Sequence, residues 1–287
     1  MALTEAQPLV SIITPVYNGA AYLDSLIQSV LQQDYPRIEH IVIDDGSTDD
    51  GATAAVLQRY PHLRWWSRPN RGQYATLNEG LAAAQGAVVS LINADDEYVV
   101  PSAISAALAH WKAHPQADCV YGRLLYIDAT GAPRLAQTHL AGPWPPAWLK
   151  YLCFIAHSSL FVSRELLLDR QLWFDSTLCC TGDWDWLIRL AEAGGRFSFV
   201  DRPLSRYRLQ ADQMTQTRAS RIMAEEREIC RRYGVSYHFH RALSGLASLH
   251  DAAWLGWAVL RWGGPAALVR RVAAWRARRL ALRRLAR

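Results

Sequence analysis

Short, largely apolar runs and one amphipathic segment alternate at the start of the chain. Residues 10–16 and 39–43 have the length and apolar character of strands that are buried on both faces of a sheet. Between them, residues 20–33 place apolar side chains at helical spacing, and Pro36 ends that helix. Because a strand, a helix and a second strand form a right-handed crossover unit, the pattern predicts an α/β fold with a parallel sheet.

A third apolar run, residues 88–92, stops just before two adjacent carboxylates, Asp95 and Asp96. The run at 39–43 likewise continues directly into Asp44 and Asp45. Ligands bind at the carboxyl edge of such sheets, and two like charges side by side favour a cation between them and another anion. We therefore expect a divalent metal, Mn or Mg, that holds a diphosphate; an ordinary solvated turn is the alternative interpretation.

Glycine-rich phosphate-binding loops are missing from the sequence. It contains neither a G-x-G-x-x-G nor a G-x-x-x-x-G-K-[ST] motif. The negative charge of a diphosphate must then be neutralised in another way. A metal on Asp95 and Asp96 suits this purpose, because a hard divalent cation needs only one or two carboxylates when substrate phosphates supply the remaining oxygens.

Composition places the chain among globular proteins of a reducing compartment. The 287 residues are 51% hydrophobic, which is enough for one large domain or two small ones. The five cysteines include no C-x-x-C pair, so neither a disulfide framework nor a zinc site is indicated. Neither a signal-peptide pattern nor an apolar run of membrane-spanning length occurs. These features predict a cytoplasmic location.

Charge is distributed unevenly along the chain. Residues 252–287 contain nine arginines and no acidic residue, whereas the first 251 residues carry 22 basic and 26 acidic side chains. The net charge of +5 therefore comes from the tail. Because the body is mildly acidic and lacks the basic and aromatic pattern of an RNA-binding module, we expect no nucleic acid partner.

Several motifs together resemble one enzyme family. They are Ile-Thr-Pro-Val-Tyr-Asn at 13–18, Ile-Asp-Asp-Gly-Ser-Thr-Asp at 43–49, Asn-Arg-Gly-Gln at 70–73 with Leu-Asn-Glu-Gly at 77–80, Leu-Ile-Asn-Ala-Asp-Asp-Glu-Tyr at 91–98, and Thr-Gly-Asp-Trp-Asp-Trp at 181–186. Each is weak alone, but their order and spacing are similar to glycosyltransferase family 2 over residues 8 to 212. The resemblance implies an α/β, GT-A-like fold with a mixed, mainly parallel sheet flanked by helices.

The resemblance also implies roles for individual residues. Asp45 is expected to read the base, and Asp96, with Asp95, is expected to hold the metal; Asn93 stands where many relatives have Asp. A carboxylate can accept hydrogen bonds from N–H groups of uracil, thymine or guanine, so Asp45 does not identify which base is bound. The residues expected to bind the nucleotide sugar are Pro15, Tyr17, Asn18, Asp45, Arg71, Gln73, Asn78, Asn93 and Asp95.

Two acidic residues open a helix in the second half. The resemblance implies that Asp183 is the general base and that Asp185 is structural. The alternative is that both acids only stabilise the helix N-terminus through its dipole. Gln210 stands where many relatives have His, and His157 is interpreted as a hydrogen-bonded structural residue.

Three segments are expected along the chain. Residues 1–115 form a nucleotide-sugar-binding half, residues 116–215 an acceptor-binding half of the same domain, and residues 216–287 a helical extension rich in Arg and Trp. Glu225 is expected on an exposed face of the first helix of this extension. Tryptophans and arginines in the tail are typical of helices at an anionic membrane surface. Packing on the body and dimerisation remain open alternatives.

The predicted function is transfer of a sugar from a nucleotide-diphosphate donor to a hydroxyl of a saccharide or lipid-linked acceptor, with inversion. A role in cell-surface polysaccharide or glycolipid synthesis, at the inner face of the membrane, is expected. Two alternatives remain: a non-catalytic nucleotide-sugar-binding scaffold of an assembly complex, and a nucleotidyltransferase on a related sheet. The sequence names neither the donor sugar nor the acceptor.

Overall fold

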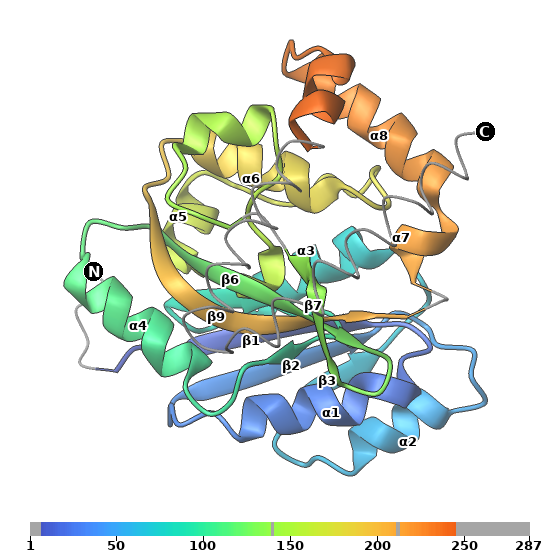
Figure 1. Cartoon of the computed structure of the whole chain (residues 1–287). Helices are drawn as coiled ribbons and strands as arrows, with labels where there is room; N and C mark the ends of the chain where they lie inside the picture. Colours follow the sequence, from blue (N-terminus) through green and yellow to red (C-terminus); the bar gives the residue numbers. More distant parts are fainter. Residues whose placement is uncertain (1–6, 139–140, 211–212, 245–287) are drawn as a thin grey trace, which may run out of the picture.

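A nine-stranded mixed sheet forms the centre of the molecule (Figure 1). The computed structural model describes residues 7–138, 141–210 and 213–244. The strand order is β3-β2-β1-β4-β8-β6-β9-β5, and β7 pairs with β6 outside this path. The strands are β1 Val10–Val16, β2 Ile38–Asp44, β3 Arg64–Ser67, β4 Val88–Leu91, β5 Glu97–Tyr98, β6 Cys119–Asp128, β7 Pro133–Thr138, β8 Leu160–Ser163 and β9 Phe197–Leu209.

The sheet is parallel in its first half and mixed in its second. Strands β1 to β4 pair in parallel, and so do β6 and β9. Strand β8 runs antiparallel between β4 and β6, while β5 and β7 are antiparallel to their neighbours. The predicted α/β fold with a mixed sheet is thus confirmed, and one continuous sheet joins the two expected halves.

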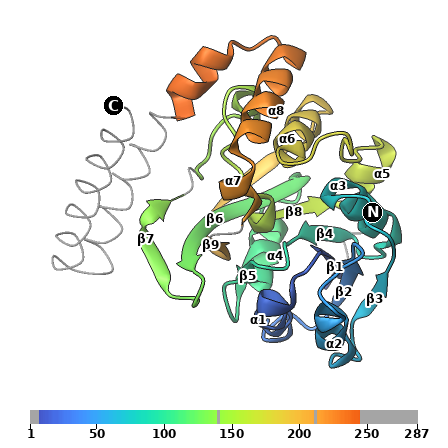
Figure 2. The same ribbon diagram turned by 90° about the vertical axis from the view of Figure 1, so that its right-hand side faces the viewer.

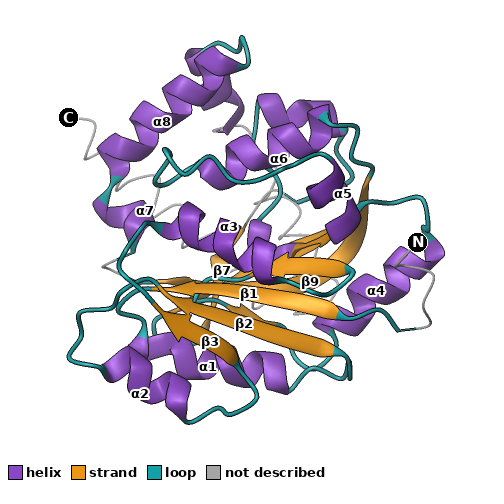
Figure 3. Ribbon diagram, turned by 180° about the vertical axis from the view of Figure 1, so that it is seen from behind, coloured by secondary structure: helices purple, strands orange, loops and turns teal. Residues whose placement is uncertain are grey.

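Helices cover both faces of this sheet (Figure 3). Alternate side chains of β1 explain why: Ile12 packs in one core cluster and Ile13 in the other, and all seven residues of the strand are buried. The helices are α1 Ala20–Leu31, α2 Ala52–Gln58, α3 Gln73–Ala83, α4 Ala103–Ala113, α5 Arg164–Asp169, α6 Gly182–Glu192, α7 Met214–Thr217 and α8 Ala219–Arg232, with 3₁₀ turns η2 Pro146–Lys150 and η3 His157–Ser159.

Helices α1, α2 and α4 share the core cluster of Ile12, whereas α3, α5 and α6 share that of Ile13. Helix α8 lies beside α6 (Figures 1 and 2), and its Ile229 and Cys230 are buried in the same cluster as α6. The first helix of the expected C-terminal extension is therefore part of the body. The Arg- and Trp-rich tail lies outside the described residues.

Candidate functional site

A cleft of about 1260 Å³ lies across the carboxyl ends of the parallel strands. Chain segments that follow β1, β2 and β4 line one part of it, and η3, α6 and the segment after β9 line another. Of the residues predicted to form the site, eight line this cleft: Pro15, Tyr17, Asn18, Asp45, Gln73, Asn93, Asp95 and Asp183. Three others, Arg71, Asn78 and Asp96, are not among the residues that line it.

Asp45 is held in place by its surroundings. Its Oδ1 accepts from the backbone N–H of Arg71 at 2.8 Å and from the Arg68 guanidinium, and its Oδ2 accepts from the N–H of Gly72 at 3.0 Å. Gly72 has a φ of 87°, which a residue with a side chain rarely adopts. The neighbouring Asp44 bonds instead to Ser47, so Asp45 is the carboxylate that β2 presents to the cleft.

The end of β1 forms the outer rim of the cleft. Tyr17 is 51% exposed. Asn18 adopts a left-handed backbone with φ of 50°, and its Oδ1 accepts from the N–H of Thr48 at 2.7 Å. Its own N–H donates to Ser47 at 2.8 Å, so Asn18 joins the segments after β1 and β2 and does not cap α1.

The two carboxylates that follow β4 occupy different environments. Asp95 lines the cleft, and its Oδ2 accepts from Gln210 Nε2 at 2.8 Å. Asp96 is 0% exposed, and its carboxylate accepts from the N–H of Arg208 at 3.1 Å and from Asn93 Nδ2 at 3.4 Å. Burial raises the pKa of both groups, and the charge of Asp95 further raises that of Asp96.

This geometry bears on the expected metal ligand. Asp96 was expected to be the principal one; its carboxylate is 0% exposed and accepts from the backbone of β9. Asp95 is the acidic side chain of the motif that lines the cleft. The sequence alone does not tell which of the two adjacent carboxylates lines the cleft.

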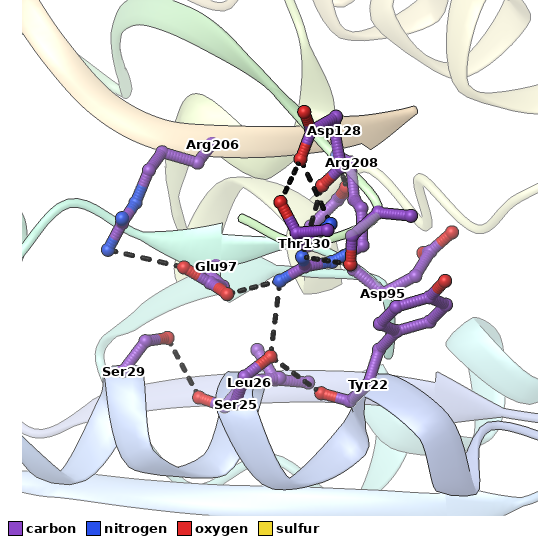
Figure 4. A network of polar contacts seen from close by, with 12 residues as sticks. Tyr22, Ser25, Leu26, Ser29, Asp95, Glu97, Asp128, Thr130, Arg206 and Arg208 are labelled. Atoms are coloured by element: carbon purple, nitrogen blue, oxygen red, sulfur yellow. Dashed lines mark hydrogen bonds and ion pairs between the residues drawn. The ribbon is translucent and has the colours of Figure 1, made fainter. Parts of the chain in front are cut away.

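Arg208 secures the acidic loop from behind (Figure 4). This guanidinium is 3% exposed; its Nε donates to the Asp95 carbonyl at 3.0 Å, and Nη2 donates to Glu97 and to Ser25 Oγ at 3.2 Å. It also lies 4.8 Å from the ring of Tyr22, which lines the cleft. A single buried arginine thus connects β9, α1 and the loop after β4, a role that the sequence pattern did not reveal.

The groups around Asp95 fit a hard cation when substrate phosphates complete its ligand shell. Within the described ranges, no group of three or more His, Cys, Asp or Glu side chains could hold a metal alone. Asp95 supplies one carboxylate, and the amide side chains of Asn93 and Gln210 lie beside it. Oxygen donors of this kind suit Mg²⁺ or Mn²⁺ held jointly by protein and diphosphate.

Asn78 was also expected to bind the nucleotide sugar; in the structure its amide bonds to the backbone of Phe174. Its Nδ2 donates to the Phe174 carbonyl at 2.9 Å, while its Oδ1 accepts from the Phe174 N–H at 2.7 Å. The amide therefore forms a two-point bridge from α3 to the segment before α6. This bridge joins the two halves of the chain away from the cleft.

Asp183 is the acid that α6 presents to the cleft. Its Oδ2 lies 3.2 Å from His157 Nδ1, and its Oδ1 accepts from the Trp184 N–H at 2.9 Å and from the Tyr74 hydroxyl at 3.4 Å. Burial alone would raise the pKa of Asp183, but the hydrogen bond and charge of His157 outweigh it and hold this pKa below its usual value. Asp183 is thus ionised at neutral pH.

Asp185, two residues later, points away from the cleft. It is 0% exposed, and its carboxylate accepts from Arg189 Nε at 2.8 Å, Arg232 Nη1 at 2.8 Å and the Tyr233 hydroxyl at 2.9 Å. A step of two residues turns a helical side chain by about 200°. Asp185 therefore attaches α8 to α6 and has no access to an acceptor.

Glu225 of α8 closes the N-terminal end of α6. It is 4% exposed and accepts from the backbone N–H groups of Cys179 at 2.9 Å, Cys180 at 2.8 Å and Thr181 at 3.1 Å. These donors immediately precede α6, whose N-terminus also favours negative charge. The expectation that Glu225 lies on an exposed face is wrong. It rested on the charged residues that follow Glu225 at 226–228, a pattern typical of a solvated helix face.

Comparison with known proteins confirms the predicted GT-A-like fold: the curled mixed sheet flanked by helices matches solved glycosyltransferase structures. The sequence profile of glycosyl transferase family 2 matches residues 11–181. The chain belongs to this family.

Individual relatives extend the comparison. Chondroitin synthase of Escherichia coli is 28% identical over 192 residues, which are 65% of this chain and 27% of that protein. Staphylococcus aureus TarS 1–349 in complex with UDP-GlcNAc has a TM-score of 0.59 at 20% identity, covering 73% of this chain and 61% of that one. The mannosyltransferase PcManGT from Pyrobaculum calidifontis, in complex with GDP-Man and Mn²⁺, has a TM-score of 0.59 at 22% identity, covering 95% and 81%.

The matched segments span between 15% and 39% of the curated relatives' own lengths. Among the described residues, no helix is long and apolar enough to cross a membrane.

Proposed function

We propose that the protein transfers a sugar from a nucleotide-diphosphate donor to an acceptor hydroxyl, with inversion at the anomeric carbon. One observation carries this proposal: Asp45, Asp95 and an ionised Asp183 line the same cleft from three different elements. A scaffold has no use for an ionised carboxylate that buried neighbours hold in place. Inverting displacement requires one such proton acceptor beside the incoming hydroxyl.

Asp45 is proposed to bind the base. Its Oδ2 accepts one hydrogen bond, from the N–H of Gly72, and a carboxylate oxygen can accept two. The remaining lone pair suits an imide N–H of uracil, thymine or guanine. The related structures that contain UDP-GlcNAc and GDP-Man are both compatible with this proposal.

Asp95, with Asn93 and Gln210 beside it, is proposed to hold a divalent metal, Mn or Mg, together with the donor diphosphate. The bound metal would supply charge neutralisation for the leaving diphosphate. Asp183 takes the proton of the acceptor hydroxyl while that oxygen bonds to the anomeric carbon and the bond from this carbon to the diphosphate oxygen breaks. In this proposal Asp96 stabilises the loop after β4, and Asp95 is the main metal ligand.

The acceptor is proposed to be a saccharide or a lipid-linked saccharide in cell-surface polysaccharide or glycolipid synthesis. The similarity to chondroitin synthase supports a polymer or oligosaccharide product. The nine arginines of residues 252–287 support a cytoplasmic enzyme that is held at the anionic inner face of a membrane through its tail.

A panel of UDP-, GDP- and dTDP-sugars tests the proposal. With Mn²⁺ or Mg²⁺, we expect one donor to bind and to be slowly hydrolysed to the nucleoside diphosphate and the free sugar. Asp45→Asn should weaken binding of that donor. Donor binding without turnover with any saccharide acceptor would favour the scaffold, and release of inorganic diphosphate from a nucleoside triphosphate would favour a nucleotidyltransferase.

A further inference from the structure

His157 lies at the first position of η3, between two other residues that line the cleft, Ala156 and Ser158. Its side chain is 14% exposed. The ring is placed by η3, which is anchored because the Ser159 hydroxyl donates to the Arg123 carbonyl of β6 at 3.0 Å. His157 therefore projects from a short 3₁₀ turn that is anchored to the sheet.

The ring contacts Asp183 through one nitrogen. Nδ1 of His157 lies 3.2 Å from Asp183 Oδ2, whereas Nε2 is buried and has no hydrogen-bond partner among the described residues. An ionised carboxylate only accepts hydrogen bonds, so Nδ1 carries a proton and donates it to Asp183 Oδ2.

The other oxygen of Asp183 is less firmly held. Oδ1 accepts from the Trp184 N–H at 2.9 Å and from the Tyr74 hydroxyl at 3.4 Å. A separation of 3.4 Å is at the outer limit of a hydrogen bond. An acceptor hydroxyl can replace Tyr74 there, provided that Oδ2 remains fixed by His157.

Several elements contribute charged or titratable groups around His157 and Asp183. Asp183 faces His157 from α6, and the Tyr74 hydroxyl reaches Asp183 from α3. Burial raises the pKa of Cys153, which lies in the segment before η3, and the charge of Asp183 raises it further. Burial raises the pKa of Asp95, and the hydrogen bond from Gln210 is the largest influence that opposes this. At Asp183, the hydrogen bond from His157 is the largest influence that counters burial.

We infer that His157 is a positioning residue for the proposed base: its Nδ1–H fixes Oδ2 of Asp183, keeps this partly exposed carboxylate ionised and leaves Oδ1 available to the acceptor hydroxyl. The inference rests on the proposed function of Asp183. It differs from the structural interpretation of His157, because a purely structural histidine would contribute stability without affecting the ionisation of the base.

The pH dependence of kcat separates these roles. His157→Leu removes the donor, so the pKa of Asp183 should rise, and the acid limb of the kcat profile should move upward by about one to two pH units, the size expected for a hydrogen bond to an ionised group. His157→Asn places an amide N–H near the Nδ1 position and should restore most of the wild-type profile. Donor affinity, measured by calorimetry, should stay unchanged in both variants.

Titration of the Asp183 carboxyl by ¹³C NMR gives a readout that does not depend on turnover. We expect this carboxyl to titrate at higher pH in His157→Leu than in the wild type and close to the wild-type pH in His157→Asn. Should the leucine variant fail to fold, His157→Gln, whose amide reaches the Nε2 position, serves in its place.

Equal carboxyl titrations in all three proteins would overturn the inference. Failure of the proposed function gives a different result. Full turnover by Asp183→Asn would show that Asp183 is not the base, while the carboxyl titration of the wild type would still report on its pairing with His157.

Discussion

Replacing Glu225 tests whether α8 belongs to the catalytic body. In Glu225→Ala, the N–H groups of Cys179, Cys180 and Thr181 lose their acceptor, and so does the Thr181 hydroxyl, which donates at 3.1 Å. An orphaned buried donor costs about 1–3 kcal/mol, but Cys179 and Cys180 line the cleft, where water can reach them. A loss of about 3–5 kcal/mol results from the buried Thr181 donors and the partly hydrated N–H groups of Cys179 and Cys180 together.

Thermal unfolding is the assay. For a domain of this size, each kcal/mol shifts Tm by about 2–4 °C, so Glu225→Ala should melt about 10 °C below the wild type. Glu228→Ala is the matched control: it lies on the same helix, its side chain is 41% exposed, and its ion pair with Arg231 is a surface pair whose loss costs about 0–1 kcal/mol.

The effect should depend on pH with a definite sign. Burial alone would raise the pKa of Glu225, but its backbone N–H donors and Arg221 outweigh burial and lower it. A carboxyl whose folded pKa is lowered contributes its stability above the unfolded pKa of about 4.3 and loses it as the pH falls through the folded pKa. The Tm difference should therefore narrow as the pH is lowered from 6 toward 3. Equal melting of Glu225→Ala and Glu228→Ala at pH 7 would refute this account of α8.

Further predictions concern the loop after β4, the bridge between the halves, and the tail. Asp95→Asn should weaken metal-dependent binding of a nucleoside diphosphate about 10- to 100-fold in calorimetry, and Asp96→Asn should weaken it less; the reverse order would restore Asp96 as the main ligand. Asn78→Ala should lower the free energy of unfolding by about 2 kcal/mol in a denaturant titration, through the loss of two hydrogen bonds, with donor affinity unchanged. Removal of residues 264–287 should leave donor binding intact and abolish sedimentation with anionic liposomes, and binding of the full chain should weaken with salt; salt-independent binding would favour packing or dimerisation.

The parts of the fold that the sequence predicted are those with local signals. The apolar runs before Asp45 and Asp95 predicted two strands of the parallel sheet, since a strand buried on both faces needs an unbroken apolar stretch. Helical geometry turns Asp183 and Asp185 of α6 apart, and the family resemblance pointed to Asp183; in the structure Asp183 lines the cleft and Asp185 is buried.

What the sequence did not predict depends on contacts between distant segments. Arg208 reaches Ser25 across 183 residues, and Glu225 reaches Cys180 across 45. No spacing rule connects such pairs, and a charged side chain is by default expected at the surface. Asn78 was assigned to the donor site because it lies within a motif, but its two bonds to Phe174 show that the motif also contains residues that connect the halves.

The proposed chemistry depends most on Asp183. The substitution Asp183→Asn keeps the shape of the side chain and one oxygen, which can accept from either His157 or Trp184, but the amide cannot take a proton. Transfer to the acceptor should fall by a factor of about 10² to 10⁴, while calorimetry should give wild-type affinity for the donor with its metal. Transfer at the wild-type rate by a folded Asp183→Asn protein would contradict the mechanism.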